Sequence, residues 1–453
     1  MSLDAILNQI NNIIWGAPLL ILISGVGLYF TLSLKGIQLS QLGRAFVYMF
    51  KPEKGKGQSG DISAFAALST ALAATIGTGN IVGVATAIHS GGPGALFWMW
   101  LIALFGMATK YAEGLLAIKY RTKDKAGFVA GGPMYYIELG MGKKWRWLAK
   151  AFAFFGVLVA LLGVGTFPQV NGITASLEST FDVPIIFSAI ILTLVVAVII
   201  LGGVKRISKI ATIIVPFMAI GYVVASLCVI LIHAEKVPAA ITTIIHAAFN
   251  PQAALGGAFG FTVMQAIQYG VARGIFSNES GLGSAPIAAA AAQTKEPVRQ
   301  GLISMTGTFL DTIIVCTMTG LVIVISGAWT TDVKGAVLTT TAFTQGLDSS
   351  FGAVIVTLAL VFFAFTTILG WCYYGERCFV YLTQGKTQFL KFYRLLFIGL
   401  IATAPFLKLD TIWTIADILN GLMAFPNLIA LLALRKVILA ETKNFFSRLK
   451  KEK

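Results

Sequence analysis

The sequence has few charged residues and few cysteines. Asp, Glu, Lys and Arg make up 12% of its 453 residues, whereas 57% are hydrophobic. A soluble domain carries roughly 25% charged residues, so this composition excludes an ordinary soluble protein and indicates a polytopic membrane protein. The four cysteines form no C-x-x-C pair, and we expect neither a disulfide nor a metal framework. The N-terminus lacks the pattern of a cleavable signal peptide.

The sequence also lacks the motifs of a membrane-embedded enzyme. It has no H-E-x-x-H, no G-x-S-x-G and no phosphate-binding glycine-rich loop with its lysine. The excess of 34 Lys and Arg over 19 Asp and Glu would suit a nucleic acid, but these charges fall between hydrophobic runs and report membrane topology. We therefore expect no enzyme, no nucleic-acid partner and no organic cofactor, and no protein partner is evident.

Long apolar runs dominate what is present, and they predict an all-α protein that crosses the lipid bilayer of the cell membrane. Residues 1–14 and 36–50 are expected to form amphipathic helices at the membrane surface. The predicted transmembrane helices number eleven and cover residues 15–34, 62–90, 93–119, 148–170, 183–202, 207–233, 256–292, 298–327, 350–381, 388–406 and 411–435.

The charges in the connections predict the orientation. Lys and Arg gather in alternate connections, from Lys35 to Lys56, from Lys119 to Arg146 and onward to the basic tail after Arg435. The opposite connections hold only Lys236, Lys334 and Lys408. By the positive-inside rule, the N-terminus is outside and the C-terminus is cytoplasmic.

Two of the predicted helices contain an interruption near the middle of the membrane. The first has the sequence A-A-T-I-G-T-G-N at residues 73–80, roughly 13 residues or about 20 Å into its run. Free backbone groups at that depth are tolerated only where they line a cavity or hold a ligand. The alternative is close helix packing, because Gly79-x-x-x-Gly83 is also a small-residue packing pattern. The second interruption covers residues 270–281.

The positions of the two interruptions predict an internal repeat. With the first helix set aside, the remaining ten form two sets of five, and each set begins with an interrupted helix. Because five is odd, the second set must start from the opposite face, so the repeats are inverted. The predicted parts are 1–61 (surface helix, extra transmembrane helix and cytoplasmic loop), 62–233 (first repeat), 234–255 (extracellular connection), 256–440 (second repeat) and 441–453 (basic cytoplasmic tail).

The two breaks predict what the protein can bind. In the first, the outer half-helix begins at Thr78–Asn80, so its N–H groups point at the break with partial positive charge. In the second, we expect the outer half-helix to end near Gln268–Gly270, so that its carbonyls face the break. Facing donors and acceptors suit an amino-acid zwitterion, and the carbonyl and hydroxyl oxygens suit an alkali cation.

Four motifs resemble the alanine or glycine:cation symporter family. They are A-T-I-G-T-G-N-I-V-G at 74–83, G-V-A-R-G-I-F-S-N-E-S-G-L-G-S at 270–284, G-G-P-M-Y-Y at 131–136 and G-W-C-Y-Y-G-E-R at 370–377. The resemblance covers residues 15–440. It implies a leucine-transporter-type 5+5 inverted repeat with one extra N-terminal helix. It also implies import of alanine or glycine with sodium or, in some members, protons.

The resemblance assigns roles to single residues. Hydroxyls of Thr366 and Thr367 would meet carbonyls of Ala73 and Ile76 around sodium, unless they only bond their own helix. If only one of the two hydroxyls binds the ion, we expect Thr367 to be the dispensable one. The positions that match a second ion site are Thr75 and Asn80. The substrate site would comprise Thr78, Gly79, Gln169, Gln268, Gly270, Gly274, Phe276 and Trp371.

Some of these residues have simpler interpretations. Gln169, at the outer end of an intact helix, could donate its amide to the substrate carboxylate or cap a loop. Phe276 and Trp371 would limit the substrate volume or only pack. The intramembrane charges Arg273, Glu279 and Asp311 are expected to be structural or gating residues, with Arg273 paired to Glu279 or Asp311. The alternatives to an amino-acid symporter are a transporter of another small solute and an ion channel.

Overall fold

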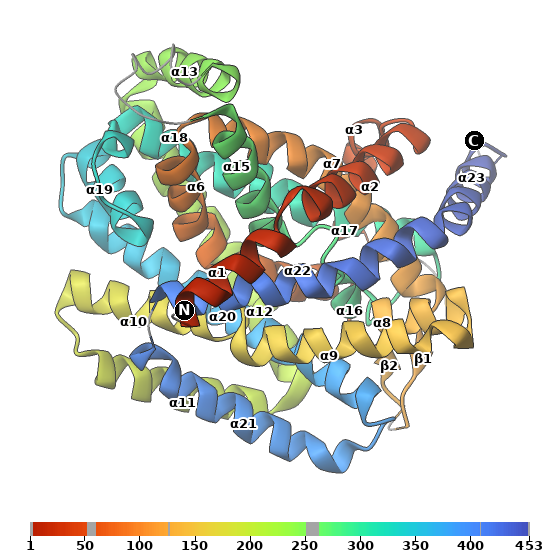
Figure 1. Cartoon of the computed structure of the whole chain (residues 1–453). Coiled ribbons are helices and arrows are strands. Elements are labelled where there is room, and N and C mark those ends of the chain that lie inside the picture. Colours follow the sequence, from red (N-terminus) through yellow and green to blue (C-terminus); the bar gives the residue numbers. More distant parts are fainter. Residues whose placement is uncertain (1–2, 52–59, 126, 251–261, 408, 452–453) are drawn as a thin grey trace.

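A computed structural model describes residues 3–51, 60–125, 127–250, 262–407 and 409–451. The described part is helical except for one short antiparallel hairpin (Figure 1). The first half contains α1 (Leu3–Ile14), α2 (Ala17–Ser33), α3 (Ile37–Ser40), α4 (Leu42–Phe50), α5 (Ala64–Thr75), the π-helical turn η1 (Gly79–Gly83), α6 (Val84–Gly91), α7 (Gly94–Lys119), β1 (Thr122–Lys123), β2 (Val129–Ala130), α8 (Pro133–Tyr135), η2 (Tyr136–Met141), η3 (Lys143–Trp145), α9 (Arg146–Leu162), α10 (Phe167–Phe181), α11 (Ile185–Leu201), α12 (Gly203–Ile232), η4 (Ala234–Lys236) and α13 (Val237–Phe249).

The described residues of the second half also form mainly helices. It contains α15 (Val263–Asn278), α16 (Ala285–Ala289), α17 (Pro297–Thr308), the π-helical η5 (Phe309–Cys316), α18 (Thr317–Ser326), η6 (Ala328–Thr330), α19 (Gly335–Leu347), α20 (Phe351–Leu382), η7 (Thr387–Phe389), α21 (Leu390–Thr403), η8 (Ala404–Phe406), α22 (Leu409–Ala433) and α23 (Arg435–Lys451).

Each predicted transmembrane segment coincides with a helix or an interrupted helix. Among the described residues, seven helices are long and apolar enough to cross a membrane, and the bent pair 64–75 and 79–91 makes an eighth. The other three predicted segments coincide with the shorter helices α11, α15 and α21. Residues 256–261 of one predicted segment and 251–255 of the predicted connection lie outside the described residues.

Four features differ from the sequence-based prediction. The predicted segment 148–170 is interrupted at 163–166, and the chain continues as α10. Two connections in which no transmembrane helix is predicted, those after residues 233 and 327, contain α13 and α19. Residues 441–451 of the predicted basic tail belong to α23, and 452–453 lie outside the described residues. α23 contacts the end of α7 through Lys119 Nζ, which lies 2.6 Å from Glu441 Oε1. The missed helices are short, which is why a search for long runs does not find them.

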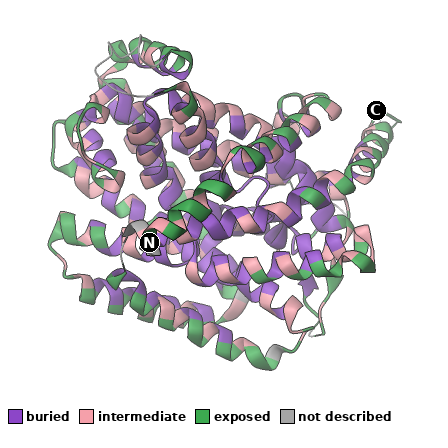
Figure 2. Cartoon of the chain, viewed as in Figure 1, coloured by how far each residue is buried: buried purple, intermediate pink, exposed green. Residues whose placement is uncertain are grey.

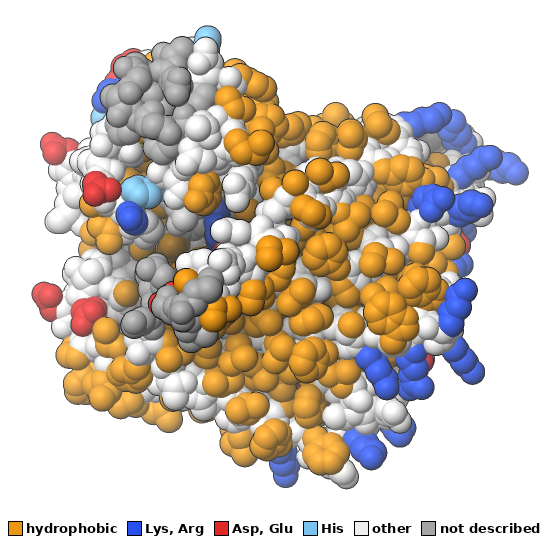
Figure 3. All heavy atoms as spheres, viewed as in Figure 1, with side chains coloured by type: hydrophobic (Ala, Val, Ile, Leu, Met, Phe, Trp, Pro, Cys, Tyr) orange, Lys and Arg blue, Asp and Glu red, His pale blue; other side chains and the backbone are white. Residues whose placement is uncertain are grey.

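The outer surface has the character expected of a protein in a bilayer. Large apolar side chains such as Ile213, Phe217 and Ile220 on α12 are exposed. Hydrophobic atoms cover the middle of the visible face, and Lys and Arg gather at the end where α23 lies (Figure 3). The buried residues concentrate in the centre, around α7, α20 and α22, and the exposed ones lie on peripheral helices such as α11 (Figure 2). The polar residues that lie in this centre are therefore the candidates for function.

One end of the first interrupted helix is tied to one end of the second. Ile62, just before α5, forms a parallel bridge with Ala292, just after α16. Arg121, at the end of α7, donates from one guanidinium nitrogen to the carbonyls of Ala290 (2.9 Å) and Ala292 (2.7 Å). It also donates to the carbonyl of Thr294. The two interrupted helices and α7 therefore form one connected unit at this end.

Candidate substrate and ion site

The first predicted break is present at the predicted place. α5 ends at Thr75 and the chain turns by 52° before it continues as η1 and α6. Three backbone groups of the break are bonded by side chains. Gly77 N donates to Asn80 Oδ1 (2.9 Å), Thr78 N donates to Gln169 Oε1 (3.1 Å), and Ile76 O accepts from Thr367 Oγ1 (3.1 Å). The stretch is therefore a true interruption and not only a packing motif.

The second break is present, but the sequence-based prediction placed it too early. α15 continues through Gly270 and Gly274 and ends at Asn278, so its last carbonyls lie about 15 Å further along the helix axis than Gln268. The break is at 279–284, where Glu279 (φ 56°) and Gly281 (φ 87°) adopt left-handed conformations. The expectation that carbonyls of Gln268–Gly270 face the break is wrong, and those of Phe276–Asn278 take that position.

Gly270 and Gly274 let α15 pack closely against a neighbouring helix. A Cβ at Gly270 would lie 2.4 Å from the carbonyl oxygen of Ala95, and one at Gly274 would lie 2.8 Å from Ile102 Cγ2. Both neighbours belong to α7. Small residues let membrane helices approach closely, and sequence alone does not separate this use of glycine from a break.

The two breaks meet around Asp311. A Cβ on Gly79 of the first break would lie 3.1 Å from Ser277 Cα of α15. The carboxylate of Asp311 accepts from Asn80 Nδ2 (2.7 Å), Ser277 Oγ (2.9 Å) and Thr312 Oγ1 (2.7 Å). Asp311 lies in the π-helical segment η5 and is fully buried. Neutral donors from both breaks therefore hold it, and the predicted pairing with Arg273 is wrong.

Arg273 instead pairs with Asp417 of α22. Its guanidinium lies over the rings of Phe276 (5.4 Å) and Trp413 (5.6 Å), and these two rings are 5.2 Å apart. The ion pair and the aromatic rings close the space between α15 and α22 beside the second break. Asp417 and Trp413 were missed, although an aspartate inside an apolar run is itself a functional signal.

Glu279 also lacks the predicted arginine partner. One carboxylate oxygen accepts from Trp371 Nε1 at 2.9 Å and the other accepts from Ser284 Oγ at 2.6 Å. A second buried carboxylate, Glu113 on α7, accepts from Gly281 N (3.2 Å) and Asn427 Nδ2 (2.7 Å). Glu113 therefore holds the backbone of the second break, a role that the sequence does not indicate.

The two neighbouring threonines of α20 face different helices. Thr367 directs its hydroxyl to the carbonyls of Ile76 (3.1 Å) and Phe363 (3.0 Å). Thr366 directs its hydroxyl to Met218 Sδ of α12 (3.6 Å) and also bonds Phe363 O (3.0 Å). The expectation that Thr367 is the dispensable one disagrees with this geometry, because only Thr367 reaches the first break. Thr75 bonds the carbonyl of Ala71 on its own helix (2.7 Å), and Ala73 is buried.

Gln169 reaches the first break from an unexpected position. It lies in the first turn of α10, directly after the interruption at 163–166. Its Oε1 accepts from Thr78 N and its Nε2 donates to Val164 O (3.1 Å). Gly163, Gly165 and Pro168 in the sequence carry the signal for this interruption. The side chains of Gln169 and Thr367 therefore bond two nearby backbone groups of the first break, the N–H of Thr78 and the carbonyl of Ile76.

The comparisons with known proteins agree with this architecture. The model of the "Sodium:alanine symporter family" matches residues 1–453. An uncharacterized transporter of Haemophilus influenzae is 68% identical over 99% of this chain and 98% of its own. The sodium/alanine symporter AgcS of Methanococcus maripaludis is 48% identical over 98% of both chains. The crystal structure of MhsT in complex with L-phenylalanine matches with a TM-score of 0.55 and 14% identity over 86% of this chain and 99% of that one.

The fold defines the class: an all-α polytopic membrane protein with the leucine-transporter-type fold. Within that class the chain belongs to the sodium:alanine symporter family. This family consists of transporters, which are not enzymes.

The Arg273–Asp417 pair gives a first prediction. Asp417→Leu leaves a largely buried guanidinium without its partner, and we expect it to lower the free energy of unfolding by about 3–5 kcal/mol. The double variant Arg273→Met/Asp417→Leu should recover much of this loss, because neither charge is then buried alone. Denaturant unfolding of the purified protein measures both values. A double variant no more stable than Asp417→Leu would contradict the prediction.

Proposed function

We propose that this protein is a secondary active symporter that imports a small neutral amino acid, alanine or glycine, together with sodium. The observation that carries the proposal is the meeting of two helix breaks at one buried point, with N–H groups presented by one and carbonyls by the other. Alternating access places the substrate at such a point in transporters built from inverted repeats.

The first break provides the donors for the substrate carboxylate. Thr78 N already holds a carbonyl oxygen, that of the Gln169 amide, at 3.1 Å. The hydroxyl of Thr78 is buried and has no hydrogen-bond partner among the described residues. A carboxylate that displaces Gln169 Oε1 would accept from the N–H groups of Thr78 and Gly79, and the Gln169 amide would turn its nitrogen towards it.

The second break provides the acceptors for the ammonium group. The last residues of α15 lie next to Gly79, since a Cβ on Gly79 would lie 3.1 Å from Ser277 Cα. The free carbonyls at this helix end, at Phe276–Asn278, carry partial negative charge. The side chains of Phe276 and Trp371 are large and buried, and as walls of the site they would limit the volume of the substrate side chain. These features favour alanine or glycine over a bulky amino acid.

We place the sodium ion at the first break, between the carbonyls of Ala73 and Ile76 and the hydroxyl of Thr367. The support is the 3.1 Å contact between Thr367 Oγ1 and Ile76 O, which joins a hydroxyl of α20 to a carbonyl at the end of α5. Oxygen ligands of this kind suit a hard cation. Asn80 and Asp311 offer further oxygens close to the same break.

Transport in liposomes tests the proposal directly. Purified protein should take up labelled alanine in a saturable way that depends on an inward sodium gradient, and unlabelled glycine should compete. Alanine amide should compete poorly, because it lacks the charge that the Thr78 and Gly79 N–H groups would bind. Ohmic, non-saturable flux would indicate a channel, and equal affinity for alanine and its amide would overturn the carboxylate site.

The sodium site gives a further prediction. Thr367→Val keeps the shape but removes the hydroxyl, so we expect weaker sodium binding by about 1–3 kcal/mol, or roughly 5- to 150-fold. The affinity for alanine should fall at fixed sodium and recover at saturating sodium, because the two ligands are linked. Thr366→Val is the matched control, since its hydroxyl faces Met218. A larger effect of Thr366→Val on the sodium dependence would place the ion elsewhere.

We also propose the orientation and the division of the chain. The charge asymmetry supports an external N-terminus, a cytoplasmic C-terminus and two repeats at 62–233 and 256–440, linked through 234–255. Residues 1–61 would add the extra helix, and 441–453, which include the end of α23 at Lys451, would lie in the cytoplasm. Figure 3 supports the cytoplasmic placement of the C-terminus, since Lys and Arg gather at the end of the molecule where α23 lies.

Thiol labelling tests the orientation in intact cells. Asp182→Cys and Thr331→Cys should react with an impermeant thiol reagent, and Lys123→Cys should react only after the cells are opened. All three positions are exposed. The background is Cys228→Ala, because Cys228 is the exposed cysteine among the four of the chain. The reverse labelling pattern would reverse the orientation.

A further inference from the structure

The carboxylate of Glu279 connects the second break to α20. Its Oε1 accepts the indole N–H of Trp371 at 2.9 Å, and its Oε2 accepts the hydroxyl of Ser284 at 2.6 Å. Glu279 is the first residue after α15, has φ 56° and is buried. A left-handed conformation is rare outside glycine, so the backbone here is set by its surroundings. Ser284, before α16, fixes one end of the carboxylate, and the other end is left to hold the indole.

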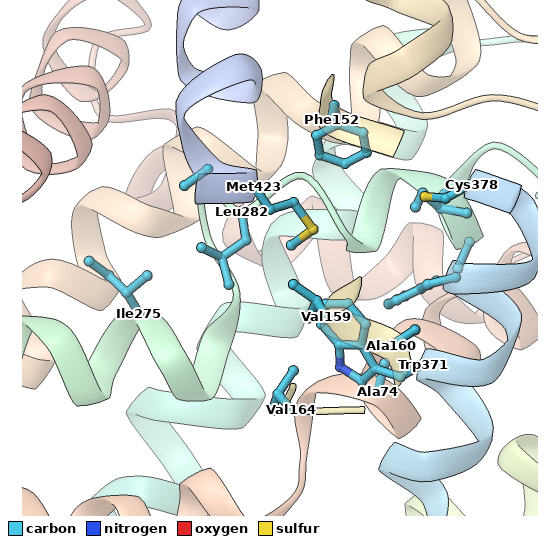
Figure 4. Close-up of a cluster of buried hydrophobic side chains, with 14 of the residues drawn as sticks. Ala74, Phe152, Val159, Ala160, Val164, Ile275, Leu282, Trp371, Cys378 and Met423 are labelled. Carbon is cyan, nitrogen blue, oxygen red and sulfur yellow. The ribbon is translucent and has the colours of Figure 1, made fainter. Parts of the chain in front are cut away.

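Trp371 lies where three interrupted segments come together. It follows Thr367 by one helical turn, so both side chains are on the face of α20 that meets the first break. A Cβ on Gly370 would lie 2.7 Å from Ala74 Cβ, and one on Gly165 would lie 2.7 Å from Trp371 Cβ. The ring lies among Val159, Val164 and Ala74 (Figure 4). The indole therefore has apolar neighbours on its ring and one polar contact at its nitrogen.

The burial of the Glu279 carboxylate costs free energy, and filling space is not a sufficient reason for a carboxylate at this position. Burying a carboxylate is unfavourable unless its oxygens are hydrogen-bonded, and Glu279 has two neutral donors and no ion pair among the described residues. An apolar residue could fill the same space, but it would leave the indole N–H unpaired and the ring free to change its χ2 angle. The carboxylate therefore fixes the angle of the ring.

We propose that Glu279 is a positioning residue that holds the Trp371 indole as a wall of the substrate site and thereby limits the size of the amino acid carried. This inference rests on the proposed function. Without the hydrogen bond, the ring can turn away from the first break and enlarge the site. The carboxylate itself does not touch the substrate.

Substrate selectivity tests this assignment. We measure the concentrations of unlabelled alanine and leucine that inhibit labelled alanine uptake by half. Glu279→Ala should lower the preference for alanine over leucine by about tenfold, the discrimination that a pocket makes for one or more methylene groups. Glu279→Gln should keep the wild-type preference, because its amide oxygen can accept the indole N–H and its NH2 group can donate to Ser284 Oγ.

Two controls separate positioning from a general structural role. Glu113→Ala removes another buried carboxylate of the same break that does not contact Trp371, and it should lower stability without a change in selectivity. In a Trp371→Phe background, which has no indole N–H, Glu279→Ala should change selectivity little further, because the two residues act through one bond.

The outcomes are distinguishable from failure of the proposed function. If the wild-type protein takes up no alanine, the proposed function fails. If it does, and Glu279→Ala keeps the wild-type preference or Glu113→Ala changes it equally, the positioning role is overturned. Should Glu279→Ala not fold, Ser284→Ala loosens the same carboxylate and must shift the preference in the same direction.

Discussion

Backbone groups that are freed in the middle of a membrane must find partners inside the protein, and the rest of this structure depends on that requirement. The first break exposes the N–H groups of Gly77 and Thr78 and the carbonyl of Ile76. Their partners come from η1, α10 and α20, which are separated widely in sequence. These hydrogen bonds hold the three elements together at the centre, because the backbone groups of the break would otherwise be buried without partners. In the proposed site, the same groups exchange these partners for the substrate or the ion.

The second constraint is charge. Asp311 and Glu279 are both buried, and their bonding partners are neutral amide, hydroxyl and indole groups. The full ion pair in this part of the described structure is Arg273 with Asp417, between α15 and α22. Exchanging one neutral donor leaves each carboxylate with its other donors, whereas breaking a buried ion pair leaves both charges without a partner. A site built from neutral donors can change its contacts during a transport cycle while the ion pair marks one closed boundary.

Much of the fold could be predicted from the sequence, because each long apolar run must become a helix in the membrane. The first break could also be predicted, since two glycines and two threonines occur together in one apolar run. The second was misplaced because Gly270 and Gly274 looked like the start of a break and in fact serve contact with α7. A glycine gives the same signal in both uses, and only the neighbouring helix decides between them.

Side-chain pairing was the least predictable part. Sequence showed that Arg273 needs a partner but not that Asp417, 144 positions away, would supply it. It showed two adjacent threonines but not which one faces the break, because that depends on the rotation of α20 about its axis. Gln169 was identified, but its place after a third interruption follows from tertiary packing at Gly163 and Gly165. Such features depend on the angle and position of whole helices, which local patterns do not encode.

The bond from Thr367 to the carbonyl of Ile76 also has a consequence for biosynthesis. The two residues are 291 positions apart in the chain. At about 5–20 residues per second, the ribosome needs roughly 15 to 60 s to supply the partner after Ile76 has been made. During this time the first interrupted helix has reached the membrane with polar backbone groups that α20 cannot yet satisfy. We expect this helix to stay beside water or the insertion machinery until α20 arrives, so assembly of the centre is completed late in synthesis.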